Sequence, residues 1–139
     1  MADIAKSGTP SLSTLEPAAG VCKLPPLSAG EALVAGDACY IASDGTIKLA
    51  NATTGDEDAQ VHGYAPISCE SGEVVTLVHN VCFRYGASLT KGAPVFLSAD
   101  TDGALATVAA AGAPGPIGFV VDATRVYLHQ NKVATVHQV

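Results

Sequence analysis

The sequence predicts an all-β domain: a small antiparallel β-barrel or sandwich of about nine short strands. Almost no stretch has a helical period, whereas many short stretches alternate between apolar and polar residues, which is typical of half-buried strands. Gly, Pro and Asp-Gly signals interrupt these stretches at short intervals, as tight turns require. A chain of 139 residues has room for one hydrophobic core. Many short strands around one core favour a barrel or a sandwich.

The strands are expected where β-branched, aromatic and small apolar residues dominate short runs. In chain order these runs are residues 37–41, 46–49, 61–67, 73–79, 81–85, 93–97, 104–108, 117–121 and 125–129. Hairpin signals separate several of them, at Ser43-Asp44-Gly45, Glu70-Ser71-Gly72 and Asp102-Gly103. A helix is possible only as a short plug, for example around residues 109–111.

The chain also contains a loose internal repeat. Aligning Gly36 with Gly92 places CYI of residues 39–41 opposite VFL of residues 95–97, and each copy then reaches an Asp-Gly turn and a Gly-aromatic pair. One such unit cannot bury its apolar face alone, so two units would close a shared core. We therefore expect a two-fold internal pseudo-repeat with structurally critical glycines. These are Gly36, Gly45, Gly63, Gly92, Gly103 and Gly118.

The two ends of the chain differ from this pattern. Residues 1–30 are rich in Ser, Thr, Pro, Ala and Gly, which favours extended chain. They predict an extended N-terminal arm without its own core, before a β-barrel domain over residues 31–130 and a C-terminal extended tail over residues 131–139. The arm is either a loose tail or a segment that becomes ordered on a partner. Its candidate contact residues are Ile4, Leu12, Leu15, Val21, Leu24, Pro25 and Pro26.

Composition argues against several classes of partner. The net charge is −6, and the seven Lys and Arg residues form no cluster that could follow a row of phosphates, so nucleic acid is not expected as a partner. No apolar run approaches the roughly 18 residues of a membrane span, so no membrane partner is expected either. The first residues lack the apolar core of a signal peptide. Synthesis in the cytoplasm is therefore expected.

A search for catalytic or metal-binding motifs finds none with the required spacing. The four histidines share no ligand spacing, and the four cysteines form no C-x-x-C pair and are expected to be small buried residues. Residues 100–103 (DTDG) resemble the start of a calcium loop, but Ala109 stands where the bidentate Glu should be. We therefore expect no catalytic residues, no metal site and no cofactor, and a protein that is not an enzyme.

One long stretch resembles a known family. Residues 45–89 are similar to the core of the head decoration proteins of lambda-like tailed phages, and more broadly to phage capsid cement proteins. The shared features are a short strand, a Thr/Gly/Asp loop, a V-x-G-aromatic strand, an acidic hairpin tip, a Val/Thr/Leu strand and the step Phe83-Arg84-Tyr85. The chain departs from the lambda type in its longer C-terminal half and its lack of tryptophan.

The resemblance implies a structural virion protein of a bacteriophage. Such a decoration or cement protein binds the outer surface of the expanded icosahedral capsid and stabilises it by bridging neighbouring capsid subunits. Its partners would be the major capsid protein and, in a homotrimer on the shell, copies of itself, with the arm residues touching capsid or neighbour.

Two other readings of the sequence remain open. One is a head-fibre base or tail adhesion domain that binds host glycans. The other is a small β-barrel enzyme or ligand carrier, whose functional groups would come together only on folding.

Overall fold

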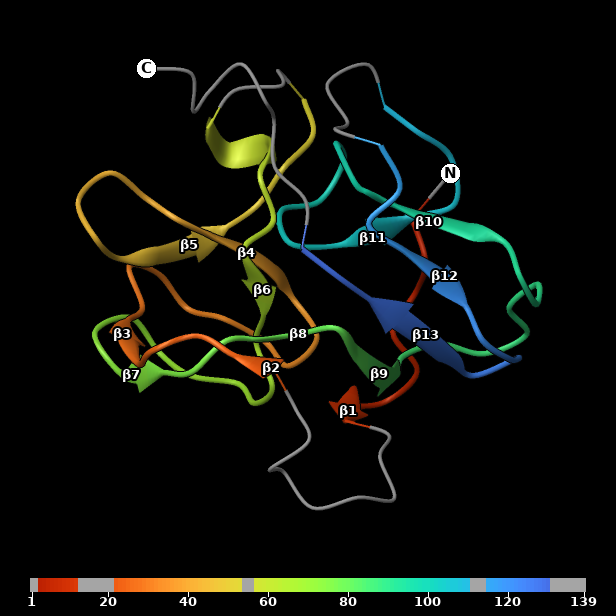
Figure 1. Ribbon diagram of the computed structural model, residues 1–139, viewed down its shortest axis with the longest axis horizontal. Coiled ribbons are helices and arrows are strands. Elements are labelled where there is room, and N and C mark those ends of the chain that lie inside the picture. Colours follow the sequence, from red (N-terminus) through yellow and green to blue (C-terminus); the bar gives the residue numbers. More distant parts are fainter. Residues whose placement is uncertain (1–2, 13–21, 54–56, 111–114, 131–139) are drawn as a thin grey trace.

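The computed structural model describes residues 3–12, 22–53, 57–110 and 115–130, and this part of the chain is all-β (Figure 1). Its strands are β1 (Ser11–Leu12), β2 (Cys22–Lys23), β3 (Leu27–Ser28), β4 (Ala38–Ile41), β5 (Ile47–Leu49), β6 (Gly63–Tyr64), β7 (Val74–Val75), β8 (Val78–His79), β9 (Val81–Arg84), β10 (Pro94–Leu97), β11 (Leu105–Ala106), β12 (Gly118–Val120) and β13 (Arg125–Leu128). Within the described ranges the helical element is a single 3-10 turn, η2 (Glu57–Ala59).

Every stretch predicted as a strand contains one, so the all-β prediction is confirmed. The predicted strand over residues 73–79 divides into β7 and β8, which belong to different sheets. Residues 109–110, where the sequence would allow a short helical plug, are not helical, and residue 111 lies outside the described residues. Small alanines are consistent with both a helix and an extended connection, so local composition does not decide between them.

The strands form three sheets, all with antiparallel pairing between named strands. The six-stranded sheet has the order β1-β9-β13-β12-β10-β11, the five-stranded sheet has the order β2-β8-β6-β4-β5, and β3 pairs with β7. In Figure 1 the six-stranded sheet occupies one side of the molecule, and the other two sheets occupy the opposite side.

The predicted repeat is present as two copies of one three-strand unit. In copy one β4 pairs with β5 and β6, and in copy two β10 pairs with β11 and β12. The registers match as well: Ile41 faces Ile47 as Leu97 faces Leu105. Cys39 faces Gly63 in copy one, and the equivalent pair in copy two is Val95 and Gly118.

The six predicted glycines serve this repeat in two ways. Four of them have a positive φ at turns: Gly36, Gly45, Gly92 and Gly103. The other two, Gly63 and Gly118, leave no room for a side chain, because a Cβ on Gly118 would lie 2.1 Å from the Tyr127 carbonyl oxygen.

The two copies use their faces differently, because the molecule has two hydrophobic clusters. Copy one is buried on both sides: Ala38 and Tyr64 pack in the larger cluster, and Cys39 packs in the smaller one. In copy two the interior residues such as Val95 pack in the larger cluster, whereas Phe119, the equivalent of Tyr64, is 46% exposed. A sheet covered on both faces needs small residues, which accounts for Ala38 and Cys39 in β4.

Copy two covers copy one partly through its Asp-Gly loop, residues 98–103. The Ala38 amide donates to the Gly103 carbonyl at 2.8 Å, and the Gly103 amide donates to the Ala50 carbonyl at 2.7 Å. The Asn51 side chain donates to Asp102 Oδ1 at 2.9 Å. These bonds satisfy backbone groups that the burial of copy one would otherwise leave unpaired.

The first described residues form a strap, residues 3–7, that joins the two copies. The Ile4 amide donates to the Leu105 carbonyl of copy two at 2.8 Å. Lys6 Nζ lies 2.5 Å from Oδ1 of Asp37, the residue before β4 of copy one. The chain then continues into β1, which pairs with β9. The strap therefore connects one edge of the six-stranded sheet, β11, to the segment that forms the other edge.

This arrangement differs from the predicted arm without a core. Ile4 is 6% exposed and belongs to the larger cluster, and Leu12 packs against the same cluster. The reason is that isolated apolar residues in a Pro- and Gly-rich segment look the same whether they cover their own barrel or a partner. The boundary at residue 30 is not a structural break, since β2 and β3 pair with β8 and β7. Residues 131–139, the predicted tail, lie outside the described residues.

Candidate binding surface

The outward face of the six-stranded sheet carries an uncovered row of large side chains. Pro94, Phe119, Tyr127 and Cys82 lie directly opposite one another across β10, β12, β13 and β9. Because side chains alternate along a strand, residues two positions away share this face, which adds Arg84 and Arg125. We call the surface formed by Arg84, Pro94, Phe119, Arg125 and Tyr127 the aromatic–arginine face.

The two aromatic rings on this face support each other. The Phe119 and Tyr127 rings stack with centroids 5.2 Å apart and an interplanar angle of 24°. Phe119 is 46% exposed, and Val121, just after β12, is 38% exposed. Exposed apolar side chains are ordinary when scattered, but a contiguous group of them is typical of an interaction surface.

The two arginines of the chain lie opposite each other on this face, on β9 and β13. Arg125 forms an ion pair with Asp122 at 2.6 Å. The hydrogen bond from the Arg125 side chain lowers the pKa of Asp122 to about 2. Arg84 is exposed, and among the residues that the structure describes no ion pair reaches it. Aromatic residues and arginine are the residue types most enriched where proteins bind one another.

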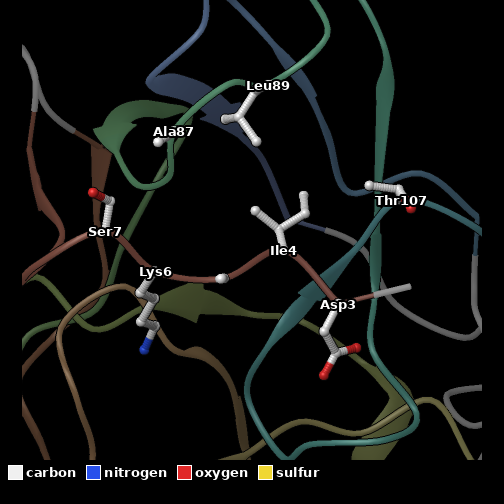
Figure 2. A pocket seen from close by; sticks show the side chains of 8 residues that line it. Asp3, Ile4, Lys6, Ser7, Ala87, Leu89 and Thr107 are labelled. Carbon is white, nitrogen blue, oxygen red and sulfur yellow. The ribbon is translucent and has the colours of Figure 1, made fainter. Parts of the chain in front are cut away.

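A hollow of about 350 Å³ lies between the strap and the segment after β9. Figure 2 shows Ile4 pointing toward Leu89, while Asp3 and Lys6 point away from them. The charged groups already have partners, because Asp3 accepts a hydrogen bond from Ser98 and Lys6 pairs with Asp37. The hollow therefore presents mainly apolar atoms and leaves no free charge from these two residues.

The predicted contact residues that the structure describes differ in burial. Ile4 is buried, Leu12 and Leu24 are partly buried against the two clusters, and Pro25 and Pro26 are exposed. Leu15 and Val21 lie outside the described residues. The structure thus removes Ile4 from the set that a partner could touch and leaves the exposed prolines in it.

The hydrogen bond of His62 and the burial of Cys39 indicate that these side chains support the fold. His62 Nδ1 accepts a hydrogen bond from the Ile41 amide at 2.9 Å, as expected for a histidine that supports the fold. Cys39 is fully buried, and burial raises the pKa of its thiol well above the usual value. Cys69 and Cys82 are only half-buried, so the expectation of buried cysteines is too strong for them.

The DTDG loop is organised by hydrogen bonds. Ser98 Oγ accepts from the Asp100 amide at 3.0 Å and from the Thr101 amide at 3.2 Å. Across the described ranges, no group of three His, Cys, Asp or Glu side chains is placed to hold a metal ion. In the same ranges no helix has the length and apolarity to cross a membrane.

Sequence reasoning found the strands of the aromatic–arginine face but did not recognise the face itself. The available signal was the repeat alignment. The alignment makes Ala38 equivalent to Pro94 and Tyr64 equivalent to Phe119. In the structure Ala38 and Tyr64 are buried, whereas Pro94 and Phe119 are exposed. Different residue types at equivalent positions indicate that this face is covered in one copy and exposed in the other. Only the structure shows which copy has the covered face.

Comparison with known proteins found no match, either to a family model or among curated proteins.

Proposed function

We propose that this chain is a structural protein of a bacteriophage virion, a decoration or cement protein on the outer capsid surface. Its partner would be the major capsid protein, and it would act as a homotrimer on the shell without nucleic acid, membrane, cofactor or enzymatic activity. The protein would be made in the host cytoplasm and bind after the shell expands.

The observation that carries the proposal is the presence of separate exposed apolar surfaces on one all-β domain. Ile67 and Val74 are 63% and 66% exposed near β7, and Phe119 is 46% exposed on β12. Figure 1 places β7 and β12 on opposite sides of the molecule. A protein that bridges two neighbours needs at least two such surfaces, and this arrangement supplies them.

The order of elements adds support through the resemblance. The features that residues 45–89 share with cement proteins fall in chain order on β5, the loop with η2, β6, the tip before β7, and strands β7 to β9. Phe83 and Tyr85 of the shared aromatic-Arg-Tyr step are buried, and Arg84 points outward. The step therefore combines core packing with a charged group on the surface.

The mechanism would be mechanical. Each copy links neighbouring subunits, and many modest contacts across a shell act together through multivalency. If the contact surface forms only in the expanded shell, binding stabilises that state by its difference in affinity.

The direct test is cosedimentation of the purified chain with expanded and unexpanded shells of the same virus, counting bound copies per shell. Saturable binding of many copies to expanded shells alone is expected. Binding of a few copies per particle would point to a vertex or tail position, and an absence of binding to expanded shells would overturn the proposal.

The untested part of the predicted arm gives a sharper variant. Replacing Leu15 and Val21 together with Ser is expected to weaken shell binding, and circular dichroism checks that the variant is folded. The matched control is Val108→Ser, a similar change at a position that is 58% exposed. Equal binding by both variants would show that the arm does not contact the shell.

A further inference from the structure

We propose that the aromatic–arginine face is a contact surface between copies of this chain, and that an acidic corner of a second copy covers it. This inference deepens the proposed function, whose homotrimer it supplies with a contact between copies, and its test uses the free chain in solution and needs no shell.

The first argument comes from the repeat. In copy one, the face that contains Ala38 and Tyr64 packs into the larger cluster together with Phe83 and Leu97 from the other sheet. Tyr64 Oη also donates a hydrogen bond to the His129 carbonyl at 2.9 Å. The equivalent face of copy two is the aromatic–arginine face, and no described element covers it. Among the described residues, therefore, one of two equivalent faces is covered by another part of the same polypeptide and the other is not.

The second argument comes from charge. The net charge of the chain is −6, yet both arginines lie on this one face, where Arg125 is paired with Asp122 and Arg84 has no ion pair among the described residues. A symmetric contact of the face with itself would bring arginines near arginines, and like charges in an interface oppose binding. The face is therefore suited to a partner surface that is apolar and acidic.

The chain carries such a surface at the turn that precedes β7. Among the described residues, Ile67 and Val74 are the most exposed large apolar ones, at 63% and 66%, and the exposed side chains of Glu70 and Glu73 lie at the same turn. The Glu70 amide donates to Glu73 Oε1 at 2.7 Å, which holds the Glu73 carboxylate at the tip. We call Ile67, Glu70, Glu73 and Val74 the glutamate corner.

The positions of the two surfaces define the kind of contact. β7 and β12 lie on opposite sides of the molecule in Figure 1, so the face and the corner cannot meet within one copy. A contact between the face of one copy and the corner of the next is heterologous. Such contacts close into rings when the rotation permits and otherwise extend into chains.

The test is sedimentation velocity of the full chain over a wide concentration range, with charge reversals on each side. Arg84→Glu on the face and Glu73→Lys on the corner are each expected to raise the dissociation constant about tenfold or more. The double variant Arg84→Glu/Glu73→Lys restores the opposite charges in exchanged positions and is expected to recover much of the association. Circular dichroism checks that each variant is folded.

Two variants serve as matched controls. Lys23→Glu makes the same kind of charge change on β2, a strand of the five-stranded sheet that belongs to neither surface, and should leave association unchanged. Asp100 and the exposed Val108 form a second region that is both acidic and apolar. Asp100→Lys reverses the charge of this region and should also leave association unchanged.

Each outcome decides the matter. Weaker association of both single variants with recovery in the double variant supports the proposal. A wild-type chain that stays monomeric at its highest soluble concentration overturns it. So does an effect of Arg84→Glu without an effect of Glu73→Lys, which would place a different surface against the face. None of these results depends on whether the chain binds shells.

Discussion

Copy one and copy two of the repeat have the same strand pairing and nearly the same register, yet they experience different surroundings. Strands β4, β5 and β6 lie between two hydrophobic clusters, whereas β10 and β12 of copy two have one covered face. Equivalent positions therefore differ in solvent exposure: Tyr64 is completely buried, and Phe119 is 46% exposed. The comparison teaches that backbone pairing specifies the unit, while the residues on its second face reveal what that face meets.

The largest expected difference is at this aromatic pair. Tyr64→Ala should lower the free energy of unfolding by about 3–5 kcal/mol, because it empties a fully buried site and removes the hydrogen bond to His129. Phe119→Ala should change it by about 1 kcal/mol or less in the monomer. Urea unfolding at low protein concentration measures both. Similar losses at the two positions would contradict the proposed difference in covering.

The two glycines that face the neighbouring strand come next. A Cβ on Gly118 would meet the Tyr127 carbonyl oxygen at 2.1 Å, so Gly118→Ala must separate β12 from β13, and a loss of about 3 kcal/mol or more is expected. A Cβ on Gly63 would meet Leu77 Cβ at 2.7 Å, and a loss of about 1–3 kcal/mol is expected for Gly63→Ala. Ser71→Ala in an exposed turn is the control. A Gly118→Ala variant as stable as the control would refute the close pairing.

The strap that joins the copies can be tested at its buried end. Ile4→Ala should lower the free energy of unfolding by about 2–4 kcal/mol, since Ile4 is 6% exposed in the larger cluster. A free arm would lose nothing on the same substitution. Chemical unfolding of the full-length variant distinguishes the two, and an unchanged midpoint would restore the arm interpretation.

A smaller difference is expected between the two Asp-Gly turns. Gly45 and Gly103 have φ values of +86° and +76°, so alanine is strained at both, at a cost of about 1 kcal/mol. A Cβ on Gly45 meets nothing within 4 Å, whereas one on Gly103 would approach Leu49 Cδ2 at 2.8 Å. Gly103→Ala should therefore cost about 1–2 kcal/mol more than Gly45→Ala. Equal costs in thermal or urea unfolding would mean that the second loop does not dock on copy one.

The smallest effect is a pH dependence that copy two lacks, because the equivalent of Asp37 in copy two is Ala93. Burial raises the pKa of Asp37 above 3.8, and the hydrogen bond from Lys6 only partly offsets this. The native state then holds this proton more tightly than the unfolded state, so stability falls as pH rises from about 3.8 through the raised pKa. The unfolding free energy of the wild type minus that of Asp37→Asn should therefore fall, or become negative, as pH rises over that interval. An increase with pH would indicate a carboxylate stabilised by its ion pair instead.

Much of the fold was predictable from the sequence because local signals carry it. The Asp-Gly hairpin at Gly45 and the alternation in residues 37–49 specify β4 and β5 without reference to distant residues. The repeat alignment was also sufficient to identify Gly63 and Gly118 as equivalent positions of the two copies. These features depend on neighbours in sequence, which composition and spacing report well.

What the sequence did not reveal depends on contacts between distant segments. Ile4 lies in the core because the strap crosses from β11 toward Tyr85, and no local pattern distinguishes that path from an arm. The aromatic–arginine face likewise depends on bringing β9, β10, β12 and β13 together in one register. Its members are scattered over more than forty positions of the chain, from Arg84 to Tyr127. Only the sheet makes them neighbours.

The most direct test of the central claim is hydroxyl-radical footprinting of the full chain at low and high protein concentration. The account predicts that Phe119 and Tyr127 are oxidised readily in the dilute protein while Tyr64 is protected, since the described residues bury Tyr64 completely and leave Phe119 46% exposed. At high concentration Phe119 and Tyr127 should become protected as a second copy covers them. Oxidation of Tyr64 as fast as Phe119 in the dilute protein would contradict the difference between the two copies, and unchanged exposure of Phe119 at high concentration would contradict its covering by a second copy.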